Sequence, residues 1–172
     1  MLAVLGDSFP VWEGFALRDE PVMNSRSRHP APDKPGPGQE SVWDYPRPPR
    51  VEQRSERVVV SLGGQVIADT TDAVRVLETS HPPVYYIPVS GFVADSLVPV
   101  GGTTYCEFKG EAHYFNVTAG NVIASRAGWS YPKPARGFEL LKDRVAVYPG
   151  KMDACTVDGE LVRAQEGDFY GG

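Results

Sequence analysis

The chain has 172 residues, of which 41% are hydrophobic and 23% charged, an ordinary composition for one globular domain. The formal net charge is −5 and the basic residues are scattered, which argues against a nucleic-acid-binding protein because such proteins need a basic surface. No apolar run approaches the roughly 18 residues of a membrane helix, and no signal peptide is recognisable. We therefore expect a cytoplasmic protein that binds neither nucleic acid nor membranes.

Two cysteines, Cys106 and Cys155, are too few for a disulfide framework, and no C-x-x-C pair is present to begin a zinc site. Two reduced thiols are the simplest interpretation in a reducing compartment. We expect neither a metal site nor a cofactor.

The N-terminal part differs in composition from the rest. Residues 1–22 have no clear period, and Met23, which opens directly into a proline-rich stretch, is the expected natural start. Because proline removes backbone donors, residues 1–39 are expected to be disordered or extended. Trp43 and Tyr45 are large apolar surfaces that should dock this arm onto a single β domain spanning residues 40–172.

From Arg50 onward the sequence predicts short antiparallel strands. In chain order the runs are "RVVVSLGGQVIADT", "PVYYIPV", "TTYCEFKG", "EAHYFNVTAGNVIASRAGWSYP", "DRVAVYPG" and "ACTVDGELVRAQ". Gly63-Gly64 and Asp158-Gly159 suit two-residue hairpin turns, and only residues 134–143 predict a short helix. This pattern indicates a compact all-β sandwich or open barrel, whose exposed edge strands leave a homodimer open.

The stretch "TTYCEFKGEAHYF", residues 103–115, concentrates reactive groups. On a regular strand Glu107 and Lys109 share one face and Cys106 lies on the other, unless a bulge at Lys109-Gly110 changes the parity. Glu107 and Lys109 then form either a solvated ion pair or two anchors for a ligand. Cys106 is either a small core residue or a nucleophile, and the core interpretation is favoured.

His81 lies in a turn that enters a strand, three residues after Glu78. A carboxylate at this spacing can orient an imidazole for acid–base chemistry, although a histidine in a turn is more often plain polar surface.

Aromatic rings beside prolines or loop residues suggest a binding pocket at the mouth of the barrel. The rings that we expect to line it are Trp129, Tyr131, Tyr85 and Tyr86. Polar anchors would come from Lys109, Glu107 and Arg75. The alternative is that these rings only close the ends of the barrel.

Several strings in this sequence resemble those of a known family. They are "ESVWDYPRPP", "RVLETSHPPVYYIP", "YCEFKGEAHYF", "GWSYPKP", "VAVYPGKMDACTVDGE" and "FYGG". In this order they resemble domain-of-unknown-function family 427, a bacterial and fungal family that carries a nucleotidyltransferase label. The family's pattern continues with a tryptophan after "FYGG", which this chain lacks.

The resemblance implies a β-tent fold like that of the Mss4 and methionine-sulfoxide-reductase-B group. Members of that group often carry zinc on two C-x-x-C knuckles, which are absent here, and nothing around Cys106 matches the reductase motif. Nucleotidyl transfer needs closely placed carboxylates to hold magnesium. Asp69 and Asp72 could hold a cation, but no glycine-rich phosphate loop accompanies them.

Three hypotheses follow. The first is a domain that binds a small polar or nucleotide-like molecule in the aromatic cleft. The second is an enzyme that uses the same cleft, with His81 or Glu78 as acid–base group and Lys109 or Cys106 as electrophile-binding group or nucleophile. The third is a protein-interaction module whose proline-rich arm engages a partner.

Overall fold

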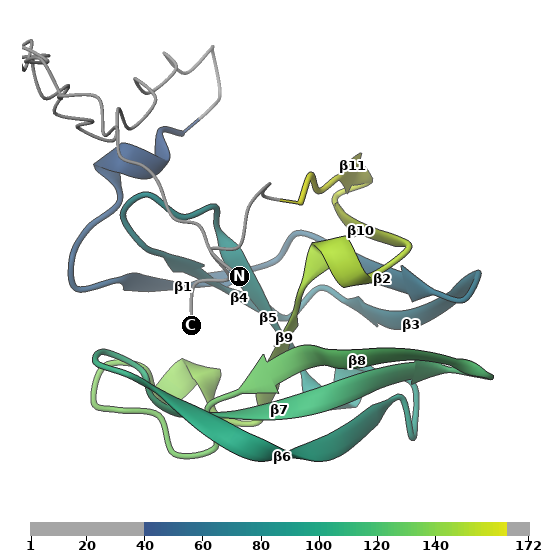
Figure 1. Ribbon diagram of the computed structural model, residues 1–172. Helices are drawn as coiled ribbons and strands as arrows, with labels where there is room; N and C mark the ends of the chain where they lie inside the picture. Colours follow the sequence, from purple (N-terminus) through teal and green to yellow (C-terminus); the bar gives the residue numbers. More distant parts are fainter. Residues whose placement is uncertain (1–39, 165–172) are drawn as a thin grey trace, which may run out of the picture. The chain divides into compact units, whose positions relative to one another are not determined.

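The computed structural model describes residues 40–164, so the expectations for residues 1–39 and for the terminal "FYGG" lie outside it. The described chain folds into a seven-stranded and a four-stranded antiparallel sheet (Figure 1), which confirms the all-β class. In spatial order the larger sheet contains β1 (Arg50–Arg54), β4 (Ala73–Leu77), β5 (Val84–Pro88), β9 (Arg144–Val147), β8 (Val122–Ser130), β7 (Gly110–Ala119) and β6 (Leu97–Cys106). The smaller sheet contains β11 (Glu160–Leu161), β10 (Ala154–Val157), β2 (Val58–Leu62) and β3 (Gln65–Thr70).

Helical structure within residues 40–164 consists of single 3-10 turns. These are η1 (Val42–Asp44), η2 (Val89–Gly91), η3 (Glu139–Leu141) and η4 (Pro149–Lys151). The helix expected over residues 134–143 is therefore limited to η3, because Gly137 has φ +90° and Asp143 has φ +57°, conformations that a right-handed helix excludes. None of these turns is long and apolar enough to cross a membrane.

Two predicted turns are confirmed. Gly63 and Gly64, with φ of +58° and +72°, connect β2 to β3 in a two-residue loop between Leu62 and Gln65. Asp158 and Gly159 do the same between β10 and β11 with φ of +49° and +83°. Positive φ at both central residues is the geometry of a primed hairpin turn.

The central strands β4, β5 and β9 of the larger sheet are largely buried on both faces. Adjacent residues of β5 point to opposite sides: Ile87 joins a core cluster with both sheets, whereas Tyr86 joins a second cluster on the other face. That second face is covered by the sheet itself, because Glu78, just after β4, lies 2.8 Å from Lys109 in the β6–β7 turn. In a flat sheet β4 and β7 would lie about 19 Å apart, so the sheet curls (Figure 1).

The segment that precedes β1 docks onto the β4–β5 turn. Ser80 donates its backbone N–H to the Val42 carbonyl at 2.9 Å, and the Thr79 hydroxyl donates to the Tyr45 carbonyl at 2.6 Å. Tyr45 is 8% exposed, as expected for an anchor, but Trp43 is 46% exposed. Tyr45 alone therefore docks as predicted.

Candidate functional site

A cleft of about 180 Å³ lies between the two sheets. The smaller sheet contributes Val58, Val60 and Cys155, and the opposite wall contains the rings of Tyr85, Trp129 and Tyr148. An engineered cavity of about 150 Å³ in another protein is large enough to bind benzene. The cleft thus has room for one ring or a short chain. Burial raises the pKa of the Cys155 thiol to about 11, so this wall stays uncharged at neutral pH.

The position of the Trp129 ring is fixed by its neighbours. Its ring centroid lies 4.4 Å from that of Tyr148, with 33° between the planes. On the other side it meets Tyr86 edge-on at 6.2 Å and 81°, and its Nε1–H donates to the Tyr86 hydroxyl at 3.1 Å. Such edge-on pairs are favourable for aromatic quadrupoles. The back wall of the cleft is therefore rigid.

Polar groups lie at the rim of this cleft. His81 Nδ1 is 2.9 Å from the Thr79 carbonyl, and its backbone N–H donates to the Glu78 carbonyl at 3.0 Å. A carbonyl only accepts, so Nδ1 carries the hydrogen and the ring is held by its own turn. Arg163 also lines the cleft, and within residues 40–164 it is not among the side chains that form ion pairs.

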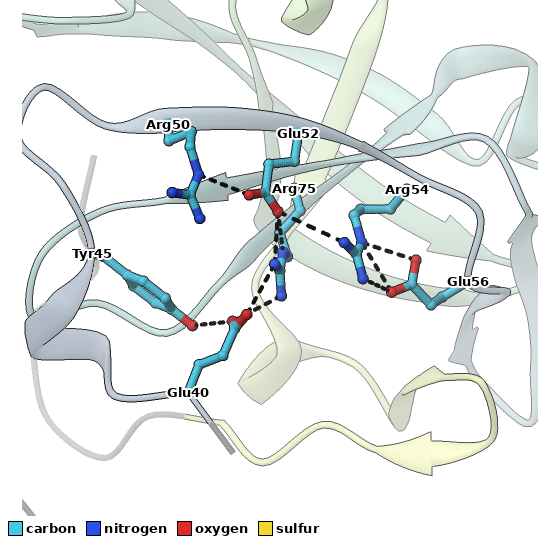
Figure 2. Close-up of polar contacts among 7 residues, drawn as sticks. All are labelled: Glu40, Tyr45, Arg50, Glu52, Arg54, Glu56 and Arg75. Carbon is cyan, nitrogen blue, oxygen red and sulfur yellow. Dashed lines mark hydrogen bonds and ion pairs between the residues drawn. The ribbon is translucent and has the colours of Figure 1, made fainter. Parts of the chain in front are cut away.

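A network of charges adjoins the cleft at Tyr85. Arg75 in β4 pairs across the sheet with Tyr85 in β5 on one side and with Glu52 in β1 on the other. The Arg75 side chain is 10% exposed and contacts Glu52 at 2.7 Å and Glu40 at 3.0 Å (Figure 2). Burial alone lowers the pKa of Arg75, but its hydrogen bonds and the charge of both glutamates outweigh burial and raise the pKa.

Two carboxylates near Arg75, those of Glu52 and Glu56, are held in the ionised form. The pKa of Glu52 is lowered mainly by its hydrogen bond from Arg75, and that of Glu56 mainly by its hydrogen bonds from Arg54 (Figure 2). Burial raises the pKa of Tyr85, and the positive charge of Arg75 opposes this shift. The hydroxyl of Tyr85 is thus a neutral group between the cleft and the ion network.

A second set of polar side chains lies on the side of Trp129 away from the cleft, at the cluster on the other face of the larger sheet. Lys109 is 4% exposed and its Nζ donates to Glu78. Cys106 and Tyr131 belong to this cluster, and within residues 40–164 the Tyr131 hydroxyl has no hydrogen-bond partner. Burial raises the pKa of Tyr131, and the charge of Glu78 adds to this shift.

The predicted site residues thus separate into three groups. His81, Tyr85 and Trp129 line the cleft, and Arg75 lies next to Tyr85. Glu78, Lys109, Cys106, Tyr86 and Tyr131 form the group behind Trp129. Glu107 is 65% exposed and pairs with Arg47 at 2.6 Å.

The shared face predicted for Glu107 and Lys109 is wrong. β6 ends at Cys106, residues 107–109 form the turn, and Gly110 begins β7 with φ +99°. Strand alternation therefore does not apply to them. Cys106 is buried beside Phe108 as a core residue.

Sequence reasoning missed Tyr148, Arg163 and the carboxylates of Glu40 and Glu52. Tyr148 precedes Pro149, the same ring-beside-proline pattern that singled out Tyr131, so this signal was present. The ion network gave no such signal, because Glu40 and Arg75 are 35 positions apart in the chain.

A curled seven-stranded sheet and a four-stranded sheet, with a ring-sized apolar cleft between them, define a small all-β domain. Residues 50–158 match the family described as Domain of unknown function (DUF427), and the chain belongs to this family. No curated protein matches the chain.

Proposed function

We propose that this protein is a cytoplasmic ligand-binding domain, and that the ligand inserts one ring or short apolar chain into the cleft between the sheets. The observation that carries the proposal is the cleft itself, an apolar space of about 180 Å³, because protein interiors are usually close-packed. Its rigid wall of Tyr85, Trp129 and Tyr148 favours a flat group, and the polar atoms at its rim would fix the orientation of that group.

The volume limits the kind of ligand. Pockets that enclose a whole drug-sized molecule measure about 300–1,000 Å³, so a complete nucleotide would extend out of this cleft. Asp69 and Asp72, the carboxylates considered for a cation, are paired with Arg57 and Arg144. These contacts favour a small ring-bearing molecule over nucleotidyl transfer.

Binding is also favoured over catalysis in the same cleft. Lys109 and Glu78 are engaged with each other, and they lie with Cys106 in a cluster behind Trp129. Convergence of such groups on one accessible point is what a reaction would need. His81 alone of the proposed catalytic residues reaches the cleft.

The test is a thermal-unfolding experiment on the full chain with p-cresol, indole and benzamide. A ligand at 100 times its dissociation constant adds about 2.7 kcal/mol, which raises the midpoint by about 5–10 °C for a chain of this size. Val157→Trp should fill the cleft and abolish the shift, because Val157 lines it. Val66→Trp adds the same ring at a position 52% exposed in the same sheet and should preserve the shift.

Either of two results would contradict the proposal: no probe raises the midpoint of the wild-type chain, or both tryptophan variants retain the shift equally. In the first case the protein-interaction module becomes the better hypothesis.

A further inference from the structure

The carboxylate of Glu40 occupies a site built to recognise a carboxylate. Arg75 donates from Nη1 to Glu40 Oε2 at 3.0 Å and from Nη2 to Oε1 at 3.4 Å (Figure 2). The Tyr45 hydroxyl donates to the same Oε2 at 2.9 Å. A two-pronged contact from arginine with an added hydroxyl donor is a specific arrangement for a planar oxyanion.

The two sides of this contact differ in how firmly they are held. Arg75 lies in a central position of β4, its side chain is 10% exposed, and Glu52 fixes it independently through two hydrogen bonds. The Glu40 side chain is 51% exposed. The arginine and Tyr45 would therefore remain in position if the Glu40 side chain left.

The charge balance of the network permits another anion to replace the Glu40 carboxylate. The members of the network in Figure 2 that carry charge are Arg50, Arg54, Arg75, Glu40, Glu52 and Glu56, which balance one another. Departure of Glu40 leaves one positive charge uncompensated, and burial makes that costly unless another anion replaces it. An incoming carboxylate restores the balance.

The place that the Glu40 carboxylate occupies is connected to the cleft through one residue. Tyr85 lines the cleft, and Arg75 is its direct cross-strand partner. Directly opposed side chains on one face of an antiparallel pair lie about 4.5–5.5 Å apart at Cβ. A ring beside Tyr85 could thus carry a carboxylate on a short linker to Arg75.

We infer that Arg75 and Tyr45 form a carboxylate subsite of the cleft, that the ligand is an aromatic or short-chain carboxylate, and that Glu40 of the chain itself competes with it. The inference rests on the proposed function and names the ligand class. Glu40 acts as an internal competitor, so its removal should strengthen the binding of carboxylates and of nothing else.

The experiment is a calorimetric titration of the full chain with benzoate, phenylacetate and 3-phenylpropionate, and with the three corresponding amides. In Glu40→Ala at least one carboxylate should bind about tenfold more tightly, equivalent to about 1.4 kcal/mol, whereas the amides should be unchanged. Glu56→Ala is the matched control: it removes the same charge from the same network, but Glu56 contacts Arg54 instead of Arg75. At about 0.15 M salt this control should leave carboxylate binding nearly unchanged.

The other outcomes distinguish the inference from the cleft proposal. If any of these ligands binds but no carboxylate gains in Glu40→Ala, or if Glu56→Ala gives the same gain, the inference is overturned and the cleft proposal stands. If neither carboxylates nor amides bind to any form, the cleft proposal itself falls. Circular dichroism verifies folding, and Glu40→Gln replaces Glu40→Ala should the latter unfold.

Discussion

Lys109 and Glu78 form an ion pair whose two partners are unequal. The Lys109 side chain is 5% exposed, whereas that of Glu78 keeps 27% of its surface. A carboxylate that loses its lysine would still be partly hydrated, but an ammonium that loses its carboxylate would be buried without compensation. The cost of breaking this ion pair therefore depends more on the burial of Lys109 than on the strength of the attraction between the two charges.

We predict that Glu78→Ala lowers the free energy of unfolding by about 3 kcal/mol and Lys109→Met by about 1 kcal/mol, because methionine preserves the packing of the lysine stem. The measurement is urea denaturation at pH 7. Glu107→Ala is the control, since its ion pair with Arg47 is solvent-exposed and should contribute less than about 0.5 kcal/mol. Equal costs for Glu78→Ala and Lys109→Met would contradict this account.

At the scale of elements, the β2–β3 turn rests on the β7–β8 turn of the other sheet. A Cβ added at Gly63 would lie 2.9 Å from Val122 Cγ2 and 3.3 Å from the Ala119 carbonyl. A Cβ at Gly64 would meet nothing within 4 Å. The two glycines have similar φ, so a comparison between them separates backbone strain from contact between the turns.

Gly64→Ala should cost about 1 kcal/mol, the price of a left-handed residue with a side chain. Gly63→Ala should cost about 1–3 kcal/mol more, because it also overpacks the contact with Val122. In the double variant Gly63→Ala/Val122→Ala much of that excess should return. Urea denaturation measures all three, and indistinguishable costs for the two glycine variants would show that the turns do not press on each other.

Turns and strands could be predicted from the sequence where the residues of the element itself determine its conformation. Gly63-Gly64 and Asp158-Gly159 define their hairpins by their own conformational preferences. β4 gave no comparable signal: "AVRVL" does not alternate, because the strand is buried along its whole length. Nor did the sequence indicate that Lys109, just beyond β6, reaches Glu78, because this is a tertiary contact between residues 31 positions apart.

In the candidate site, too, features with a local cause could be predicted and features that depend on tertiary contacts could not. Tyr85 and Trp129 line the cleft, and the sequence singles out both as rings beside prolines or loop residues. Tyr85 and Tyr86 are adjacent in one predicted strand, so strand alternation already assigns them to different faces of the larger sheet, and the expectation that both line one cleft is wrong for Tyr86. The contact of Arg75 with Glu40 was not predictable, because only the docking of the segment before β1 brings it about.

At the scale of the whole domain, two buried tyrosines link folding to pH. Tyr86 is 1% and Tyr131 0% exposed, and burial raises the pKa of both above the ordinary value of 10.0. The folded state therefore holds these protons more tightly than the unfolded state does. Their contribution to stability is complete below about pH 10 and is lost progressively as the pH rises above that value, by about 1.4 kcal/mol per pH unit for each tyrosine.

The two tyrosines nevertheless differ at neutral pH. Tyr86 accepts the hydrogen bond from Trp129, so Tyr86→Phe should cost about 1 kcal/mol by leaving the indole N–H without its acceptor. The Tyr131 hydroxyl is unpaired within residues 40–164, so Tyr131→Phe should be neutral or stabilising by up to about 1 kcal/mol.

Above pH 10 each variant should lose less stability with pH than the wild type, because one phenol no longer titrates. Urea denaturation at pH 7 and pH 10.5 tests both statements. A marked loss for Tyr131→Phe at pH 7 would mean that its hydroxyl has a partner, and an unchanged alkaline slope would mean that these phenols do not control unfolding at high pH.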